Sequence, residues 1–254
     1  MFDLKIRKKN EVYLKVEAEP HINYELADFF CFEVESAKFM QKNRRYKGWD
    51  GKIRLYSPGT GEIYVGLIDY LLDWADERGY KYEMEECKFF GHPLSENAMI
   101  TPQAVAGFVK ALHLPPQLKV RDYQYKAIYE ALKYNRRLLL SPTASGKSLM
   151  IYALVRYHVN VNRNILIVVP TTSLVEQMYK DFEEYGWMAS EYCHKIYAGA
   201  EKYTDHQVVI TTWQSVYKEP RKWFDRFDVV IGDEAHLFKA KSLTSLMGKL
   251  HECK

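Results

Sequence analysis

Two polar segments in the second half of the sequence contain residue types that can bind a nucleoside triphosphate. The first is the octapeptide SPTASGKS at residues 141–148, between an apolar run and a segment of helical periodicity. Backbone N–H groups at such a turn and helix start can bind phosphate oxygens. Lys147 can reach the β and γ phosphates, and the Ser148 hydroxyl can bind Mg²⁺. The segment therefore predicts a phosphate-binding loop.

This octapeptide departs from the common phosphate-loop pattern G-x-x-x-x-G-K-S/T, because position 141 is Ser. Ala144 stands where a second glycine is frequent. An alanine at positive φ costs about 1 kcal/mol, so we expect the loop to avoid that conformation. A GKS tripeptide alone is also an ordinary turn, but its place between a strand pattern and a helix pattern favours phosphate binding.

The second polar segment is Asp233-Glu234-Ala235-His236, directly after the aliphatic residues 229–231. A buried strand would deliver these side chains to its C-terminal end, where ligands bind in open α/β sheets. There Asp233 can hold Mg²⁺ and Glu234 can polarise a water molecule. The alternative is an acidic helix N-terminus stabilised by the helix dipole.

A third candidate is a basic segment, residues 38–54, which holds seven cationic side chains and a single acid, Asp50. Its cations alternate with aromatic residues, so they can pair with phosphates while the rings stack on exposed bases. The alternative is a solvated hairpin edge that blocks aggregation. We favour DNA contact, because this +6 cluster lies within residues 1–115, whose net charge is −2. The expected contacts are Lys42, Arg44, Arg45, Lys47, Lys52 and a stacking Trp49.

The elements that must position these residues fall into two patterns. Residues 1–90 alternate short strand-like and helix-like pieces, which predicts a small α+β module. We expect hairpins over residues 4–16 and 52–67, helices over 22–32 and 68–78, a left-handed Gly79, and a strand over 80–84. Residues 91–119 contain four prolines and are expected to form a linker with one short helix.

From residue 120 onward, continuous aliphatic strands alternate with helices, as a parallel sheet covered on both faces requires. The predicted strands are residues 138–140, 165–169, 208–210 and 229–231, and the predicted helices are residues 147–158 and 173–185. The second domain, residues 120–254, is therefore expected to be doubly wound α/β.

Composition limits the protein class. A chain of 254 residues with 47% hydrophobic side chains can bury a core, which excludes disorder. The net charge of +3 neither requires nor excludes a nucleic-acid partner. The N-terminus lacks the apolar stretch of a signal peptide. The four cysteines, Cys31, Cys87, Cys193 and Cys253, have no metal-site spacing, so we expect isolated thiols in a reducing cytoplasm.

Several segments together resemble the motifs of superfamily 2 helicases. SPTASGKS and DEAH are similar to motifs I and II, and residues 169–177 (VPTTSLVEQ) are similar to motif Ia. Residues 210–214 (ITTWQ) resemble the TxxQ-type strand end of these enzymes, and residues 121–124 (RDYQ) resemble their Q motif. The resemblance implies an α/β fold, with a RecA-like P-loop NTPase lobe preceded by a nucleic-acid-binding α+β module.

The resemblance also implies residue roles. Gln124 would bind the adenine edge with Arg121 and Tyr123 near the base, and His236 would link the site to the DNA-binding elements. The phosphates would lie against Thr143, Ala144, Ser145, Gly146, Lys147 and Ser148, with ATP and Mg²⁺ as cofactors. The DNA backbone would contact Thr171, Thr172, Gln177, Thr212, Trp213 and Gln214. For single residues the alternatives are an ordinary strand end at Thr212 and a helix cap at Thr172 or Ser173.

Residues 39–54 resemble the N-terminal module of the phage UvsW family of recombination and repair helicases. That family implies ATP-driven movement on branched DNA, namely forks, Holliday junctions and R-loops, without sequence preference and as a monomer. In superfamily 2, motif III and a second RecA-like lobe with its arginine finger follow motif II. We therefore expect a fragment of a longer helicase, with very weak turnover by itself. The rival functions are a nucleotide-dependent DNA-binding module without turnover and the first lobe of a restriction or remodelling translocase.

Overall fold

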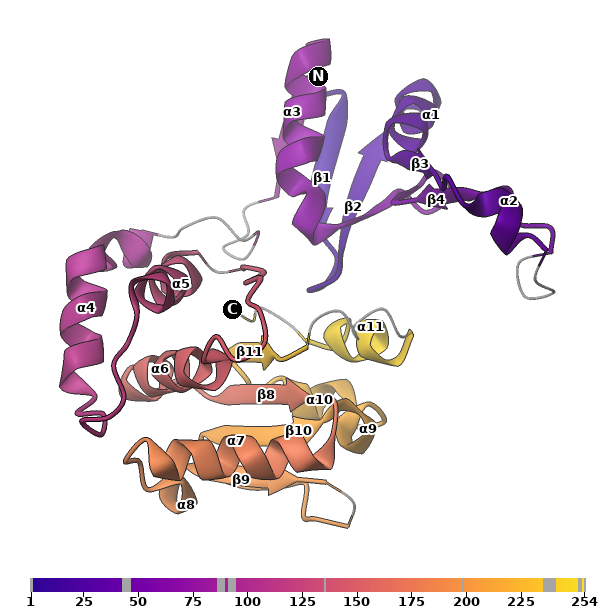
Figure 1. Ribbon diagram of the computed structural model, residues 1–254. Coiled ribbons are helices and arrows are strands. Elements are labelled where there is room, and N and C mark those ends of the chain that lie inside the picture. Colours follow the sequence, from indigo (N-terminus) through magenta and orange to yellow (C-terminus); the bar gives the residue numbers. More distant parts are fainter. Residues whose placement is uncertain are drawn as a thin grey trace. The chain divides into compact units, whose positions relative to one another are not determined.

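The computed structural model describes residues 2–42, 47–85, 90, 95–134, 136–197, 199–234, 241–250 and 253. The chain divides into two compact units, residues 1–87 and 88–254 (Figure 1). No helix in the described ranges has both the length and the apolar character needed to cross a membrane.

The first unit is built on a five-stranded sheet with strand order β5-β6-β2-β1-β7. The expected first hairpin is confirmed, because β1 (Leu4–Lys8) pairs antiparallel with β2 (Tyr13–Ala18). Alternation turns their apolar side chains to one face, where α1 (Pro20–Phe29) and α3 (Ile68–Arg78) add Leu26 and Leu71 to the buried residues. Gly79 ends α3 at φ 72°, as expected. The remaining strands are β5 (Tyr56–Ser57), β6 (Glu62–Tyr64) and β7 (Tyr82–Met84).

The predicted second hairpin is only partly correct. Residues 52–57 change partners at Leu55: β4 (Lys52–Arg54) pairs with β3 (Cys31–Glu33), whereas β5 pairs with β6. The β3 pairing also explains why α1 ends at Phe29 rather than at residue 32. A short helix, α2 (Ala37–Met40), follows β3, and the 3₁₀ turn η2 (Val65–Leu67) follows β6.

The second unit contains an all-parallel sheet with strand order β11-β8-β10-β9, which confirms the α/β class. Side chains alternate between its faces: Ile165, Ile167 and Val169 of β8 face one apolar core, and Leu166 and Val168 face another. The strands are β8 (Ile165–Val169), β9 (Cys193–Ile196), β10 (Val208–Thr212) and β11 (Val229–Gly232). The pattern identified three of them, and β9 was missed.

Helices contribute side chains to both cores of this unit (Figure 1). The larger core contains residues of α4 (Pro102–Ala111), α5 (Asp122–Lys133), α6 (Lys147–Asn160) and α7 (Thr172–Glu184). The smaller core contains residues of α9 (Trp213–Val216), α10 (Arg221–Phe224) and α11 (Lys241–Met247). The 3₁₀ turn η3 (Ser95–Met99) and α8 (Ala189–Tyr192) complete the described elements.

Two expectations about this unit need correction. Residues 138–140 form no strand, and the Leu138 and Leu140 side chains are 68% and 88% exposed. A strand forms only where a neighbouring strand pairs with its backbone N–H and C=O groups, and within the described residues β11 pairs with β8 alone. The short helix expected within residues 91–119 is present as α4, but its Val105 and Val109 are buried in the larger core, so the segment is not a separate linker.

Candidate functional site

The phosphate-loop sequence forms a tight turn that leads directly into α6. The Ser145 N–H donates to the Pro142 carbonyl at 3.3 Å, and Gly146 caps the helix at φ 77°. Ala144 has φ 60°, so the expectation that it avoids this conformation was wrong. Left-handed residues therefore stand on both sides of Ser145, and the loop accepts the cost of about 1 kcal/mol that this conformation has at alanine.

The predicted adenine-reading segment holds this loop in place. Gln124 is buried, and its Nε2 atom donates to the Ser145 carbonyl at 2.9 Å while its Oε1 atom accepts from the Arg121 backbone N–H at 2.8 Å. The Tyr123 hydroxyl donates to the same Ser145 carbonyl at 2.8 Å. A side chain at Gly146 would place its Cβ only 2.4 Å from Gln124 Nε2. Contact of Gln124 with adenine stays a prediction.

The two polar segments that define the candidate site meet in space. Lys147 Nζ lies 3.3 Å from Glu234 Oε1, although 87 residues separate them. Asp233 follows β11 and donates its backbone N–H to Val168 of β8 at 3.0 Å, while its Oδ1 atom accepts the Glu234 N–H at 2.9 Å. Both ion-paired side chains are about one-third exposed, so the pair contributes only about 0–1 kcal/mol. A phosphate can therefore displace Glu234 from Lys147 at small cost.

Ser148 has partners that the sequence did not reveal. Its Oγ atom lies 2.8 Å from the hydroxyl of Tyr185 at the end of α7, and Asp181 of α7 is also a neighbour. Burial raises the pKa of Asp181 above its usual range, and the polar Ser148 side chain offsets only part of this shift. The i, i+4 spacing of Asp181 and Tyr185 on one helix is the only signal that could have marked them. No direct hydrogen bond joins Ser148 to Asp233 in the described part of the chain.

The predicted DNA-contact residues after β8 and β10 differ in availability. Thr171 caps α7 by accepting the Leu174 N–H at 3.3 Å, whereas Thr172 and Gln177 are exposed. Thr212 is 4% exposed and its hydroxyl pairs with Ser215 at 2.9 Å, so it is a buried strand end and not a free contact. The further residues of this segment, Trp213 (half-buried) and Gln214 (exposed), remain candidates.

The basic segment of the first unit is described in part, because Arg44, Arg45 and Tyr46 lie outside the described residues. Lys42 and Lys47 are exposed, and Lys42 Nζ lies 5.5 Å from the centre of the Phe39 ring. Lys52 pairs with Glu33 at 3.5 Å. Trp49 is half-buried, with its indole N–H donating to the Lys52 carbonyl at 2.9 Å. His236 also lies outside the described residues.

Salt dependence separates the two kinds of contact expected of this segment. Lys47→Ala should reduce the slope of log K against log salt by about 0.9 on duplex DNA or about 0.7 on a single strand, because one phosphate contact is lost. Trp49→Phe keeps a ring and should leave the slope unchanged. Anisotropy on a forked oligonucleotide across a salt series measures both. An unchanged slope in Lys47→Ala would identify Lys47 as a solvated surface residue.

Two family models match the chain. Residues 117–253 match the model described as the res subunit of type III restriction enzymes, and residues 3–85 match the model of the N-terminal part of the DNA helicase UvsW. The ATP-dependent DNA helicase uvsW of Enterobacteria phage T4 is 33% identical over 259 residues, which cover 99% of this chain and 50% of that protein. The chain therefore spans about half the length of this curated relative.

A second relative and a solved structure agree with these matches. The DNA 3'-5' translocase XPB2 of Sulfurisphaera tokodaii is 28% identical over 134 residues, 53% of this chain and 28% of that protein. The crystal structure of the UvsW helicase from Bacteriophage T4 is similar with a TM-score of 0.79 at 32% identity, covering 99% of this chain and 89% of the crystallised chain.

Proposed function

This chain belongs to the UvsW-type helicases of superfamily 2, and on that premise we propose that it forms the ATP-binding and DNA-binding part of an enzyme that couples ATP hydrolysis to movement on DNA. The observation that carries the proposal is the 3.3 Å contact between Lys147 Nζ and Glu234 Oε1. It places a cation suited to phosphates beside a carboxylate suited to orienting water, at the ends of α6 and β11.

In this site Lys147 exchanges Glu234 for the β and γ phosphates, and the Glu234 carboxylate orients the attacking water. The loop N–H groups and the start of α6 bind phosphate oxygens. Asp233 and Ser148 offer the carboxylate and hydroxyl oxygens that Mg²⁺ prefers, and Ser148 can serve once its hydroxyl leaves Tyr185. A bound Mg²⁺ would neutralise charge that develops on the phosphates.

Branched DNA is the substrate that we propose, in the form of forks, Holliday junctions and R-loops, with RNA present only in the last. Recombination, repair and replication restart are the processes to which such an activity belongs. The exposed cations Lys42 and Lys47 and the exposed polar side chains Thr172 and Gln177 support backbone contact without sequence preference. We propose that the protein acts as a monomer.

One of the rival functions, a restriction or remodelling translocase, shares the second unit. The match to the type III restriction res subunit covers only residues 117–253, whereas the UvsW N-terminal match covers residues 3–85 as well. The first unit therefore favours the helicase. The other rival, a binding module without turnover, is distinguished by the next experiment.

Replacement of the carboxylate tests turnover separately from binding. Glu234→Gln should lower the rate of ATP hydrolysis by about 10²–10⁴-fold, because a positioned general base contributes that much. The affinity for an ATP analogue should rise by about 2- to 5-fold, since Lys147 loses only a competing partner worth up to about 1 kcal/mol. Hydrolysis measured with and without forked DNA decides the question. A Glu234→Gln variant that hydrolyses ATP at the wild-type rate would refute the assignment.

A further inference from the structure

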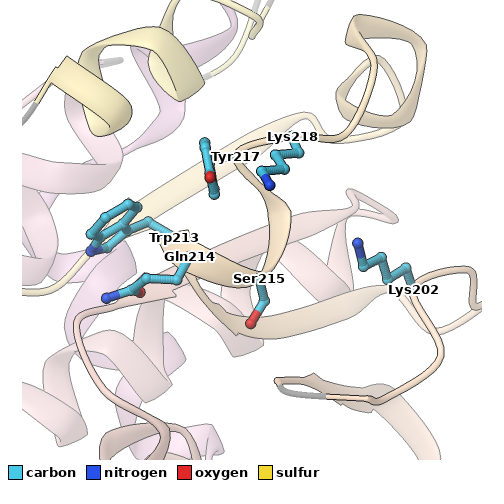
Figure 2. Close-up of a pocket in the computed structure, with 6 residues that line it drawn as sticks. All are labelled: Lys202, Trp213, Gln214, Ser215, Tyr217 and Lys218. Atoms are coloured by element: carbon cyan, nitrogen blue, oxygen red, sulfur yellow. The ribbon is translucent and has the colours of Figure 1, made fainter.

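A cavity of about 460 Å³ lies directly after β10, and Figure 2 shows the six side chains that line it: Lys202, Trp213, Gln214, Ser215, Tyr217 and Lys218. Its volume is in the range of small-ligand sites. The C-terminal ends of parallel strands are also where open α/β sheets bind ligands. The motif comparison pointed only to Trp213 and Gln214, as backbone contacts.

Two aromatic rings give the cavity a surface for a flat ligand. Trp213 and Tyr217 lie four residues apart, and their ring centres are 5.9 Å apart with the planes inclined by 66°. Both side chains are half-buried, which holds the rings while leaving part of each accessible. Any nucleobase can stack on such rings, because every base presents a π-face.

Cations lie on the other side of the same space. Figure 2 shows Lys202 and Lys218 on one side of the cavity, with Trp213 and Gln214 on the opposite side. Lys202 pairs with Glu219 at 2.5 Å. Lys218 is exposed, lies 5.6 Å from the Tyr217 ring centre, and makes no ion pair within the described part of the chain. None of the six lining residues is acidic, so a phosphate meets a free ammonium there.

One contact joins this cavity to the neighbouring strand end. Gln214 Nε2 donates to the Pro170 carbonyl after β8 at 3.4 Å, close to the exposed start of α7. A strand that follows the carboxyl ends of β8 and β10 would therefore pass the cavity.

We propose that this cavity binds one unpaired nucleotide of a DNA strand, with its base on the Trp213–Tyr217 ring pair and its phosphate on Lys218. The inference rests on the proposed function and adds base stacking to it. A base inside a duplex is already stacked on both sides, so entry requires an unpaired base or the cost of extruding one. The cavity thus selects single-stranded DNA.

The experiment compares two oligonucleotides and three proteins by anisotropy. The probes are a 20-nucleotide oligothymidine and the same backbone without bases. Wild type should prefer the oligothymidine, and Tyr217→Ala should bind it about 5- to 150-fold more weakly, the equivalent of about 1–3 kcal/mol for one stacked base. Binding of the abasic strand should hardly change. Tyr203→Ala is the matched control, because Tyr203 is exposed and lies outside the cavity.

Further outcomes test the cavity independently of the nucleotide site at Lys147. Lys218→Gln, at an exposed position where folding is safe, should lower the salt slope on both probes by about 0.7. If Tyr217→Ala lost the same affinity for both probes, or lost affinity for neither, base stacking would be overturned while DNA binding would stand. A wild type that binds neither probe would overturn the DNA-binding proposal as well.

Discussion

Gly146→Ala should lower the melting temperature by about 5–15 °C and abolish nucleotide binding. The new Cβ atom would stand 2.4 Å from Gln124 Nε2, and the residue would keep φ near 77°. The left-handed conformation costs about 1 kcal/mol, and displacing buried Gln124 from the Ser145 carbonyl costs about 1–3 kcal/mol more. In a domain of this size, 1 kcal/mol shifts the melting temperature by about 2–4 °C.

A glycine elsewhere in the same unit gives the matched control. Gly107 lies inside α4, and a Cβ atom there would meet no heavy atom within 4 Å. Gly107→Ala should therefore raise the melting temperature by about 1–4 °C, since alanine favours a helix by about 0.5–1 kcal/mol. Differential scanning fluorimetry measures both variants. If Gly146→Ala melts at or above the temperature of wild type, the contact of Gln124 with the loop does not require a glycine at position 146.

Lys147→Ala should weaken the binding of a fluorescent ATP analogue by about 10- to 150-fold. A hydrogen bond from an ammonium to a phosphate is worth about 1.5–3 kcal/mol, and this range converts to that loss of affinity. The fold should be unaffected, because the pair with Glu234 is about one-third exposed on both sides.

Lys180→Ala removes a comparable charge at no cost to the site. Lys180 is 74% exposed, and among the described residues its ion pair is with Glu184 on the surface of α7. The affinity of the Lys180→Ala variant for the analogue should equal that of wild type. If Lys147→Ala also bound as wild type does, the octapeptide would be an ordinary turn and the phosphate-loop assignment would be wrong.

The sequence predicted the elements that have strong internal patterns. The five consecutive aliphatic residues of β8 and the alternation in β1 and β2 each indicate a strand without knowledge of a partner. Residues 138–140 show the opposite case, because three leucines say nothing about whether a neighbouring strand is available. The split of residues 52–57 between β3 and β6 was hidden for the same reason.

The candidate site was predictable in its residue types but not in its hydrogen bonds. Lys147 and Glu234 were expected together and lie together. The bond from Ser148 to Tyr185 and the contact of Gln124 with the loop depend on how α5, α6 and α7 pack, which no local pattern records. The positive φ of Ala144 was missed because local cost was weighed without the closure of the loop.

The central claim is that the phosphate loop and the acidic strand end form one nucleotide site. A double-mutant cycle tests it, using the affinities of wild type, Lys147→Ala, Glu234→Gln and the double variant for the same ATP analogue. Groups in contact couple by about 0.5–3 kcal/mol, whereas independent sites are additive within about 0.3–0.5 kcal/mol. We predict a coupling of at least about 0.5 kcal/mol. Effects that add within about 0.3 kcal/mol would show that the two residues do not share a site.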